Sequence, residues 1–300
     1  MSGTFDAVTG KITAPGILAR KFASASNGSS RKIVALAAYD YPTAQLIDDA
    51  GVDIVLVGDS LGMVVLGSKN TLSVTVDETV YHTRAVRRGI WRALLVADMP
   101  YGSYHLGDAD AVRNALRLVK EAGAEAVKVE GGERRVDRIA RLVEADIPVM
   151  GHIGLTPQSV HSMGGFRVQG KTIDAAERLL RDARAVEAAG AFSIVLECIP
   201  RELAAEITRE LRIPTIGIGA GRDCDGQILV LHDLIGLSLG RAPRFARRYA
   251  NVAETISRAV GEYVQDVRIG AFPTDAESYE LPGDVREVFS AGRSEKNICV

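Results

Sequence analysis

One theme repeats along most of this chain. A short apolar, β-rich run ends in a polar residue or a glycine, and an amphipathic stretch follows it. Apolar residues at spacings of three and four, as in residues 110–124 and 173–191, predict helices in those stretches. The strand candidates are KIVALAAYD, VDIVLVGDS, RALLVADMP, AVKVEGG, IPVMGHIG, SIVLECIP, IPTIGIGAG and GQILVLHD. Eight strand–helix units over about 240 residues favour a (β/α)8 TIM barrel, an α/β fold with buried parallel strands.

A doubly wound parallel sheet is the alternative fold for this pattern. Its dinucleotide-binding form carries GxGxxG after the first strand, and that motif does not follow residues 32–40. The barrel is therefore favoured, and we predict that it spans residues 31–268. A small, polar run, ASASNGSS, indicates a loosely ordered arm over residues 1–30, and residues 269–300 are predicted to be a peripheral tail.

Charge and cysteine content narrow the function classes. The net charge is only -2, which favours neither nucleic acid nor an anionic membrane as a partner. The short basic cluster in residues 241–248 is interpreted as the solvated face of a helix. Three cysteines without a CxxC motif fit a reducing compartment, and neither a signal-peptide pattern nor a membrane-spanning apolar run is present. We therefore expect a cytoplasmic protein.

The stretch AVKVEGGE, residues 126–133, places charge where a buried strand should be apolar. Because side chains alternate along a strand, Val127 and Val129 share one face while Lys128 and Glu130 share the other. A buried charged pair is costly unless it has partners or opens onto water. This strand is therefore expected to end in a functional site.

Other strand candidates also end in groups that can do chemistry. Such an acid commonly caps the next helix, so any one of them has a purely structural explanation. Together they favour a shared site, because in a barrel the C-terminal ends of all strands surround one mouth. The positions are Asp40, Asp59 with Ser60, Asp98, Lys128 with Glu130, His152, Glu197 and Asp233.

Asp59, Asp98 and Glu130 belong to consecutive strands. Adjacent strands lie about 4.8 Å apart, so these carboxylates can meet around one cation, and oxygen ligands favour Mg²⁺. Glu197 lies across the ring, where it could act as a general base. His152 could orient a substrate or be a structural histidine. Cys198 should face outward into the core by alternation.

The segment from residue 151 to residue 172 is long, polar and rich in glycine, and it directly follows a strand end. A loop of this kind in a compact domain usually forms a lid or a binding loop. Its paired glycines and Gly170 would let the backbone approach a ligand or act as hinges.

Several of these motifs, in this order, resemble the ketopantoate hydroxymethyltransferase family over residues 31–265. The residues that carry the resemblance are VGDSLGMVVLG, TVDETVYHTRAVRRG, VKVEGG, GHIGLTPQSV, GGFRVQG, VLECIP, IGIGAG and DGQILVLHD. One departure is Ser73, where the family is expected to have proline.

The resemblance implies a barrel of the phosphoenolpyruvate mutase/isocitrate lyase type. It implies a transferase of pantothenate biosynthesis, which adds a hydroxymethyl group from 5,10-methylenetetrahydrofolate to 3-methyl-2-oxobutanoate and yields 2-dehydropantoate. Mg²⁺ is the implied metal, the folate is a co-substrate, and a homodecamer is the expected assembly.

The same resemblance implies roles for individual residues. Asp59, Asp98 and Glu130 would surround Mg²⁺, and Glu197 would be the catalytic base that removes the C3 proton to give a Mg-stabilised enolate. The substrate-binding residues would be Asp59, Ser60, Asp98, Lys128 and His152.

Two alternatives remain. A related lyase or mutase, acting on a C–C or P–C bond of a 2-oxo acid, would use the same metal-binding acids; the KKCGH motif of isocitrate lyase is absent. A non-catalytic barrel that binds a metabolite would be expected to lack some of the strand-end residues, and none is missing.

Overall fold

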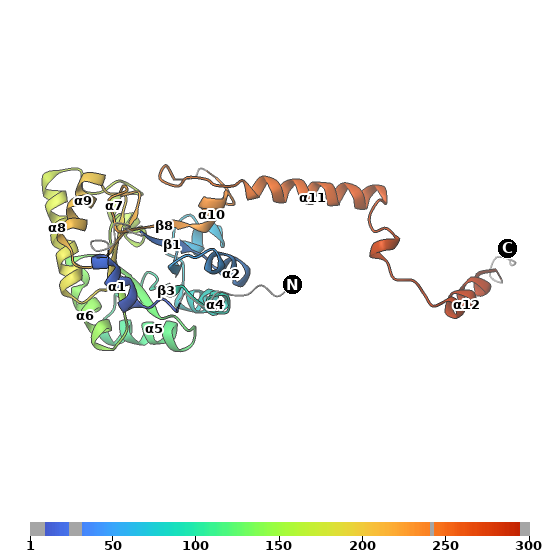
Figure 1. Cartoon of the computed structure of the whole chain (residues 1–300), viewed down its shortest axis with the longest axis horizontal. Coiled ribbons are helices and arrows are strands. Elements are labelled where there is room, and N and C mark those ends of the chain that lie inside the picture. The colour runs from blue at the N-terminus through green and yellow to red at the C-terminus, as the bar shows by residue number, and fades with distance from the viewer. Residues whose placement is uncertain (1–9, 24–31, 241–242, 295–300) are drawn as a thin grey trace. The chain divides into compact units, whose positions relative to one another are not determined.

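The structure is a computed structural model that describes residues 10–23, 32–240 and 243–294 (Figure 1). Contacts between residues divide the chain into two compact units, Met1–Ala250 and Asn251–Val300. The predicted boundary between barrel and tail lies at residue 268, whereas the division between the two units lies at residue 250.

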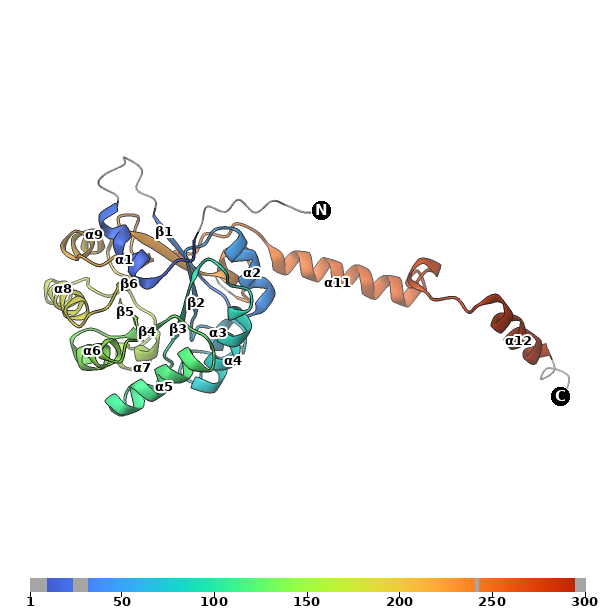
Figure 2. The same cartoon turned by 60° about the horizontal axis from the view of Figure 1, so that its bottom comes forward.

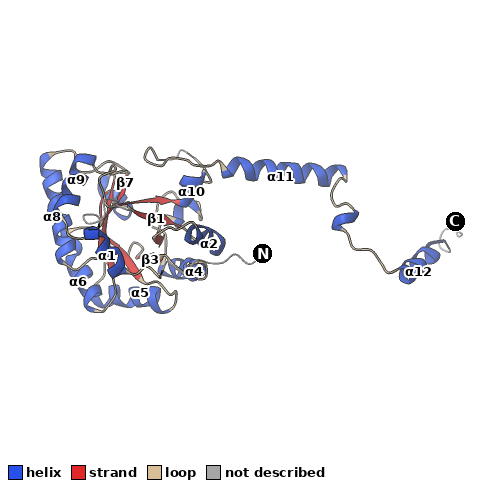
Figure 3. Ribbon diagram, in the orientation of Figure 1, coloured by secondary structure: helices blue, strands red, loops and turns tan. Residues whose placement is uncertain are grey.

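The first unit is built around a closed barrel of eight parallel strands (Figure 3). Each strand pairs with its neighbour in sequence, and β1 pairs with β8 to close the ring. The predicted α/β barrel is confirmed, and every strand lies within one of the predicted apolar runs. The strands are β1 (Ile33–Ala37), β2 (Ile54–Val57), β3 (Leu94–Asp98), β4 (Ala126–Glu130), β5 (Val149–Gly154), β6 (Ser193–Glu197), β7 (Thr215–Ile218) and β8 (Gly226–Val230).

Helices surround these strands (Figure 2). Those after β1 to β6 are α2 (Tyr41–Asp49), α3 (Leu61–Val64), α4 (Val76–Arg87), α5 (Asp108–Lys120), η1 (Glu133–Arg135), α6 (Val136–Glu144), η2 (Pro157–Ser159), α7 (Val160–Met163), α8 (Ile173–Ala188) and α9 (Arg201–Glu210). The repeat then departs from the expected strand–helix pattern. Residues 219–225 connect β7 to β8 without a helix, and the short α10 (Leu231–Ile235) is the only helix after β8 among the described residues of the first unit.

Local sequence explains where helix α4 begins. Thr75 caps α4 through a reciprocal arrangement, because its hydroxyl accepts from the Glu78 backbone N–H and the Glu78 carboxylate accepts from the Thr75 backbone N–H. Buried apolar side chains of α5, α6, α8 and α9 pack against β3 to β6 in one continuous cluster. A second cluster joins β1, β2 and β3 to α2. These two cores hold the strand ends in place around the mouth of the barrel.

A helix occupies part of the predicted arm. In α1 (Ala14–Ala23), Ile17 is fully buried and Lys21 forms an ion pair of 2.8 Å with Asp225. Arg20 pairs with Asp53 at 2.9 Å. Because these acids directly precede β8 and β2, α1 lies at the N-terminal ends of the strands. Loose order was inferred from the polar run 23–30, of which residues 24–30 lie outside the described part of the chain, and that inference does not extend to the apolar helix before it.

The second unit contains α11 (Val252–Ile269), η3 (Asp275–Glu277) and α12 (Gly283–Ser294). One side of α11 carries apolar side chains at helical spacing, and all of them are exposed: Ile256, Val260, Tyr263, Val264 and Val267. Residues 243–250, which hold most of the basic cluster, are not helical, so that part of the helix-face interpretation is wrong; Arg241 lies outside the described residues. No described helix is both long enough and apolar enough to cross a membrane.

Candidate active site

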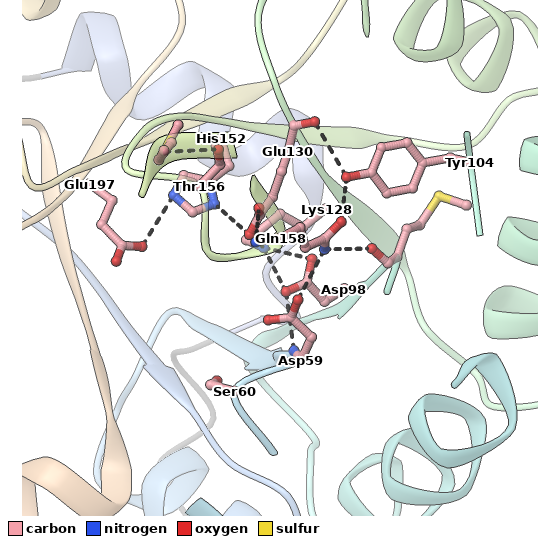
Figure 4. A network of polar contacts seen from close by, with 12 residues as sticks. Asp59, Ser60, Asp98, Tyr104, Lys128, Glu130, His152, Thr156, Gln158 and Glu197 are labelled. Carbon is pink, nitrogen blue, oxygen red and sulfur yellow. Dashed lines mark hydrogen bonds and ion pairs between the residues drawn. The ribbon is translucent and has the colours of Figure 1, made fainter. Parts of the chain in front are cut away.

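The C-terminal ends of β2 to β6 bring six of the predicted site residues into one cluster (Figure 4). Because the barrel is closed and parallel, each of these side chains starts from the same rim. The cluster comprises Asp59 after β2, Asp98 in β3, Lys128 and Glu130 in β4, His152 in β5 and Glu197 in β6.

Three carboxylates form the centre of this cluster. Asp59, Asp98 and Glu130 are buried, and each offers an oxygen within 4.8 Å of the others. Oε1 of Glu130 is buried and has no hydrogen-bond partner. Only Nδ1 of His152 at 3.3 Å and Nζ of Lys128 at 3.7 Å approach it among the described residues, and a cation held by all three acids would give it a closer partner. The donor set therefore fits a hard divalent metal ion.

Strand alternation divides β4 as expected. Val127 and Val129 pack in the core with α5 and α6, while Lys128 and Glu130 point into the cluster. Nζ of Lys128 donates to both carboxylate oxygens of Asp98 at 2.6 Å and lies 3.7 Å from Oε1 of Glu130. The buried lysine thus neutralises only part of the negative charge that the three acids bring together.

The glycines after β4 have separate roles. Gly131 takes a left-handed conformation, with φ at 120°. A side chain on Gly132 would overlap Asp182 of α8, whose carboxylate accepts from the backbone N–H of Glu133 at 2.8 Å. The absence of a side chain at Gly132 therefore lets α8 pack close to the chain where it leaves the site.

Burial and mutual repulsion shape the charges of the acids. The pKa of Asp59 is raised well above its usual value by burial, and then by the charges of Asp98 and Glu130. Burial also raises the pKa of Asp98, although Lys128 opposes that shift. For Lys128, burial lowers the pKa, but the surrounding acids outweigh it and the net shift is upward. The cluster is an anionic pocket with a single lysine, which favours binding of a further cation.

His152 connects the carboxylate cluster to Glu197. Its Nδ1 lies 3.3 Å from Oε1 of Glu130, and its Nε2 lies 3.2 Å from Oε2 of Glu197. Burial opposes the charged imidazolium, but the Glu130 and Glu197 carboxylates dominate and raise the pKa of His152 to about 9. Glu197 is the most exposed acid of the group, with 15% of its side chain accessible. It therefore lies on the rim, where a bound molecule could reach it.

Three residues that build this site were not predicted from the sequence. The amide of Gln158 donates to Oδ2 of Asp59 and to the Met99 carbonyl, both at 3.0 Å, and its backbone N–H donates to Oε2 of Glu130 at 3.0 Å. The hydroxyl of Tyr104 donates to Oε1 of Gln158 at 2.6 Å. The position of Gln158, in a polar loop directly after β5, was the only sequence signal for its role.

Tyr39 is the third missed residue, and it explains the place of Ser60. The Tyr39 hydroxyl and Oγ of Ser60 lie 2.7 Å apart, and burial raises the pKa of this tyrosine so that it stays protonated. Ser60 is thus held beside Asp59. Tyr39 directly precedes Asp40 and is uncharged, so the pattern of charged strand ends did not indicate it.

Two predicted strand-end acids have structural partners instead. Asp40 caps α2 by accepting from the Thr43 backbone N–H at 2.9 Å, and Asp233 accepts from the Ser238 hydroxyl at 2.6 Å.

Cys198 was expected in the core, but it is only partly buried and has a φ of 48°. β6 ends at Glu197, so strand alternation does not extend to Cys198.

Fold and site together define a (β/α)8 barrel with a buried carboxylate cluster at the C-terminal ends of its strands. A solved 2,3-dimethylmalate lyase, described as a member of the PEP mutase/isocitrate lyase superfamily, is similar in structure, with a TM-score of 0.56 and 18% identity over 95% of this chain and 97% of the other. At that identity the likeness concerns the fold alone.

Sequence similarity identifies the family of barrel proteins to which this chain belongs. The profile of the family described as ketopantoate hydroxymethyltransferase matches residues 19–275. A 3-methyl-2-oxobutanoate hydroxymethyltransferase from Koribacter versatilis is 56% identical over 265 residues, covering 88% of this chain and 90% of that protein. One from Pelobacter propionicus is 56% identical over 269 residues, covering 90% and 97%. The chain belongs to the ketopantoate hydroxymethyltransferase family.

Proposed function

We propose that this protein transfers a hydroxymethyl group from 5,10-methylenetetrahydrofolate to 3-methyl-2-oxobutanoate, giving 2-dehydropantoate for pantothenate biosynthesis. Membership of the family supports this reaction. The observation that carries the proposal is the buried cluster of three acids with Lys128 on one side and the His152–Glu197 pair on the other. It offers a place for a metal, an anion and a base within one mouth.

Asp59, Asp98 and Glu130 are the residues that would hold Mg²⁺. Their oxygens converge, they are buried, and one oxygen of Glu130 has no other hydrogen-bond partner. When bound, Mg²⁺ would supply a Lewis acid for the keto and carboxylate oxygens of a 2-oxo acid.

Lys128 and Ser60 would orient the 2-oxo acid. Lys128 is a fixed cation, because its ion pair with Asp98 restricts its side chain. It places positive charge where negative charge would develop as the C3 proton leaves. Ser60 is directed by its contact with the Tyr39 hydroxyl, and its own hydroxyl is suited to bind a substrate oxygen.

Glu197 would remove the C3 proton. It is the site carboxylate outside the three-acid cluster, and its side chain reaches the rim. His152 holds Glu197 from the barrel side and thereby fixes which oxygen faces the substrate. Removal of the proton leaves an enolate that can attack the one-carbon unit of the folate.

A product assay with 3-methyl-2-oxobutanoate, methylenetetrahydrofolate and Mg²⁺ tests the reaction as a whole. The base is tested by exchange of the C3 proton with solvent deuterium in the absence of folate. We expect Glu197→Gln to abolish this exchange while Mg²⁺-dependent substrate binding persists. The matched control is Glu202→Gln on the surface of α9, which should exchange at the parent rate. Exchange at the parent rate in Glu197→Gln would exclude this residue as the base.

We also propose that the protein works in the cytoplasm as a homo-oligomer, with a decamer as the expected size. The exposed apolar side of α11 supports association, because such a stripe is normally covered in a folded protein. Sedimentation measurements at micromolar concentration test the assembly, and a monomer would contradict it.

A further inference from the structure

The mouth described so far provides for the 2-oxo acid but not for the second substrate. Its buried groups are carboxylates, a lysine, an imidazole and an amide, and they are suited to a small chelating anion. A reduced folate instead presents a flat pteridine ring and a benzoyl-glutamate tail. Proteins usually bind a planar ring with an aromatic or other flat side chain. The folate subsite should therefore lie beside Glu197, where the reacting carbon of the 2-oxo acid would be.

One segment of the chain leads to the region beside Glu197. Residues 159–169, which we call the strap, are held to the site by a backbone hydrogen bond at each end. The residue before the strap, Gln158, donates from its backbone to Glu130. At the far end, the backbone N–H of Gln169 donates to the carbonyl of Cys198 at 2.9 Å, and Cys198 directly follows Glu197. The strap thus runs from the metal-binding acids to the base.

Glycines let the strap turn while leaving its middle open. Gly164 and Gly165 have φ of 67° and 110°, and no atom lies within 4 Å of a side chain built on either of them. Gly170, directly after the strap, is in contrast tightly packed, because a side chain there would overlap Leu203 and Leu179. The strap therefore has one firmly held end beside Glu197 and an open turn ahead of it.

Phe166 and Arg167 lie between these two points. Phe166 is 50% exposed, and it has no ring partner among the described residues. Arg167 is exposed and forms no ion pair within the part of the chain that the structure describes. Phe166 is three residues from Gln169, so the Cα atoms of these two residues lie within about 11 Å of each other by chain length alone. An exposed aromatic ring and an exposed guanidinium thus lie on the segment that leads to the base.

We propose that the strap is the binding site for the folate co-substrate, with Phe166 stacking on the pteridine or benzoyl ring and Arg167 pairing with a glutamate carboxylate. This inference rests on the proposed transferase reaction. Stacking of a flat ring on Phe166 removes exposed apolar surface from water, and a guanidinium matches a carboxylate in both charge and shape. Both contacts would place the one-carbon unit on the Glu197 side of the mouth.

A second exposed aromatic at the same end of the barrel provides a matched control. Tyr101 follows β3 and is 48% exposed, almost the same as Phe166. Its ring already contacts that of His105, with centroids 4.9 Å apart, and it lies on the side of Asp98 rather than Glu197. The site assignment therefore predicts opposite outcomes for two residues of equal exposure.

The test compares Phe166→Ala, Phe166→Leu and Tyr101→Ala in two assays with the full-length protein. For Phe166→Ala, we expect the KM for methylenetetrahydrofolate to rise roughly tenfold, in line with the loss of one aromatic stacking contact. Folate-independent exchange of the C3 proton should stay within about twofold of the parent rate, because that step needs only the base and the metal site. Phe166→Leu should be intermediate, and Tyr101→Ala should resemble the parent in both assays.

Titration calorimetry with tetrahydrofolate adds a direct readout, in which Phe166→Ala and Arg167→Gln should bind more weakly than the parent. An unchanged KM in Phe166→Ala, or a rise in Tyr101→Ala instead, would overturn the strap assignment while leaving the transferase reaction intact. Loss of proton exchange together with transfer would also overturn it, because Phe166 would then belong to the 2-oxo acid site. A parent protein that forms no product would overturn the proposed function, and this inference with it.

Discussion

Replacing Lys128 with methionine should destabilise the metal-free protein strongly, because it leaves Asp98 buried without its counter-charge. Methionine keeps the length and apolar part of the side chain, so the change removes mainly the ammonium group. Nζ of Lys128 lies 2.6 Å from both oxygens of Asp98, and both side chains are almost completely buried. The substitution thus isolates one electrostatic contribution.

The geometry sets the size of the effect. At 2.6 Å, two unit charges attract by about 6 kcal/mol with an effective dielectric constant of about 20. Asp98 can escape part of this loss by taking up a proton, because its pKa is already raised by burial. Breaking a buried ion pair by removing one partner typically costs about 3–5 kcal/mol, and we expect a loss of that size in the free energy of unfolding.

Urea-induced unfolding, followed by circular dichroism in EDTA, measures this loss. The matched control is Lys120→Met at the exposed end of α5, which should change the free energy of unfolding by no more than about 0.5 kcal/mol. Excess Mg²⁺ should stabilise Lys128→Met more than the parent, since a cation can then replace the missing charge. A loss below about 1 kcal/mol in EDTA would refute the reasoning.

Two further predictions follow from neighbouring contacts. Gln158→Leu should weaken Mg²⁺ binding about tenfold in titration calorimetry, because Asp59 loses the amide that orients it; unchanged affinity would show that this contact does not support the metal site. Burial and the Glu197 charge raise the pKa of Cys198 to about 12, so its thiol should stay protonated at pH 9. Its alkylation by iodoacetamide, followed by mass spectrometry, should be at least about 100-fold slower than that of glutathione. A similar rate for the two thiols would contradict a raised pKa at Cys198.

Regular spacing made part of the site predictable. The alternation of β4 directs Lys128 and Glu130 away from the core, and the parallel order of β2, β3 and β4 brings Asp59 and Asp98 beside them. Both inferences use only a period of two and a known strand separation. They needed no knowledge of side-chain conformations.

The remaining contacts depend on tertiary structure. Gln158 reaches Asp59 from a loop 99 positions away, and neutral residues in loops follow no spacing rule. Tyr39 is recognisable only once Ser60 is placed against it. No helix lies between β7 and β8, because residues 219–225 are too few to form a helix and the turns on either side of it.

The position of α1 has a consequence for how the chain folds during synthesis. The partner of Lys21, Asp225, lies 204 positions later in the chain, whereas the partner of Arg20, Asp53, lies much nearer in sequence. Pairing across so much of the sequence forms late, because the intervening chain must be ordered first. α1 is therefore fixed in place only after the much later strand β8 has been ordered. Its docking marks completion of the barrel, and amide exchange in α1 during refolding would report that final step.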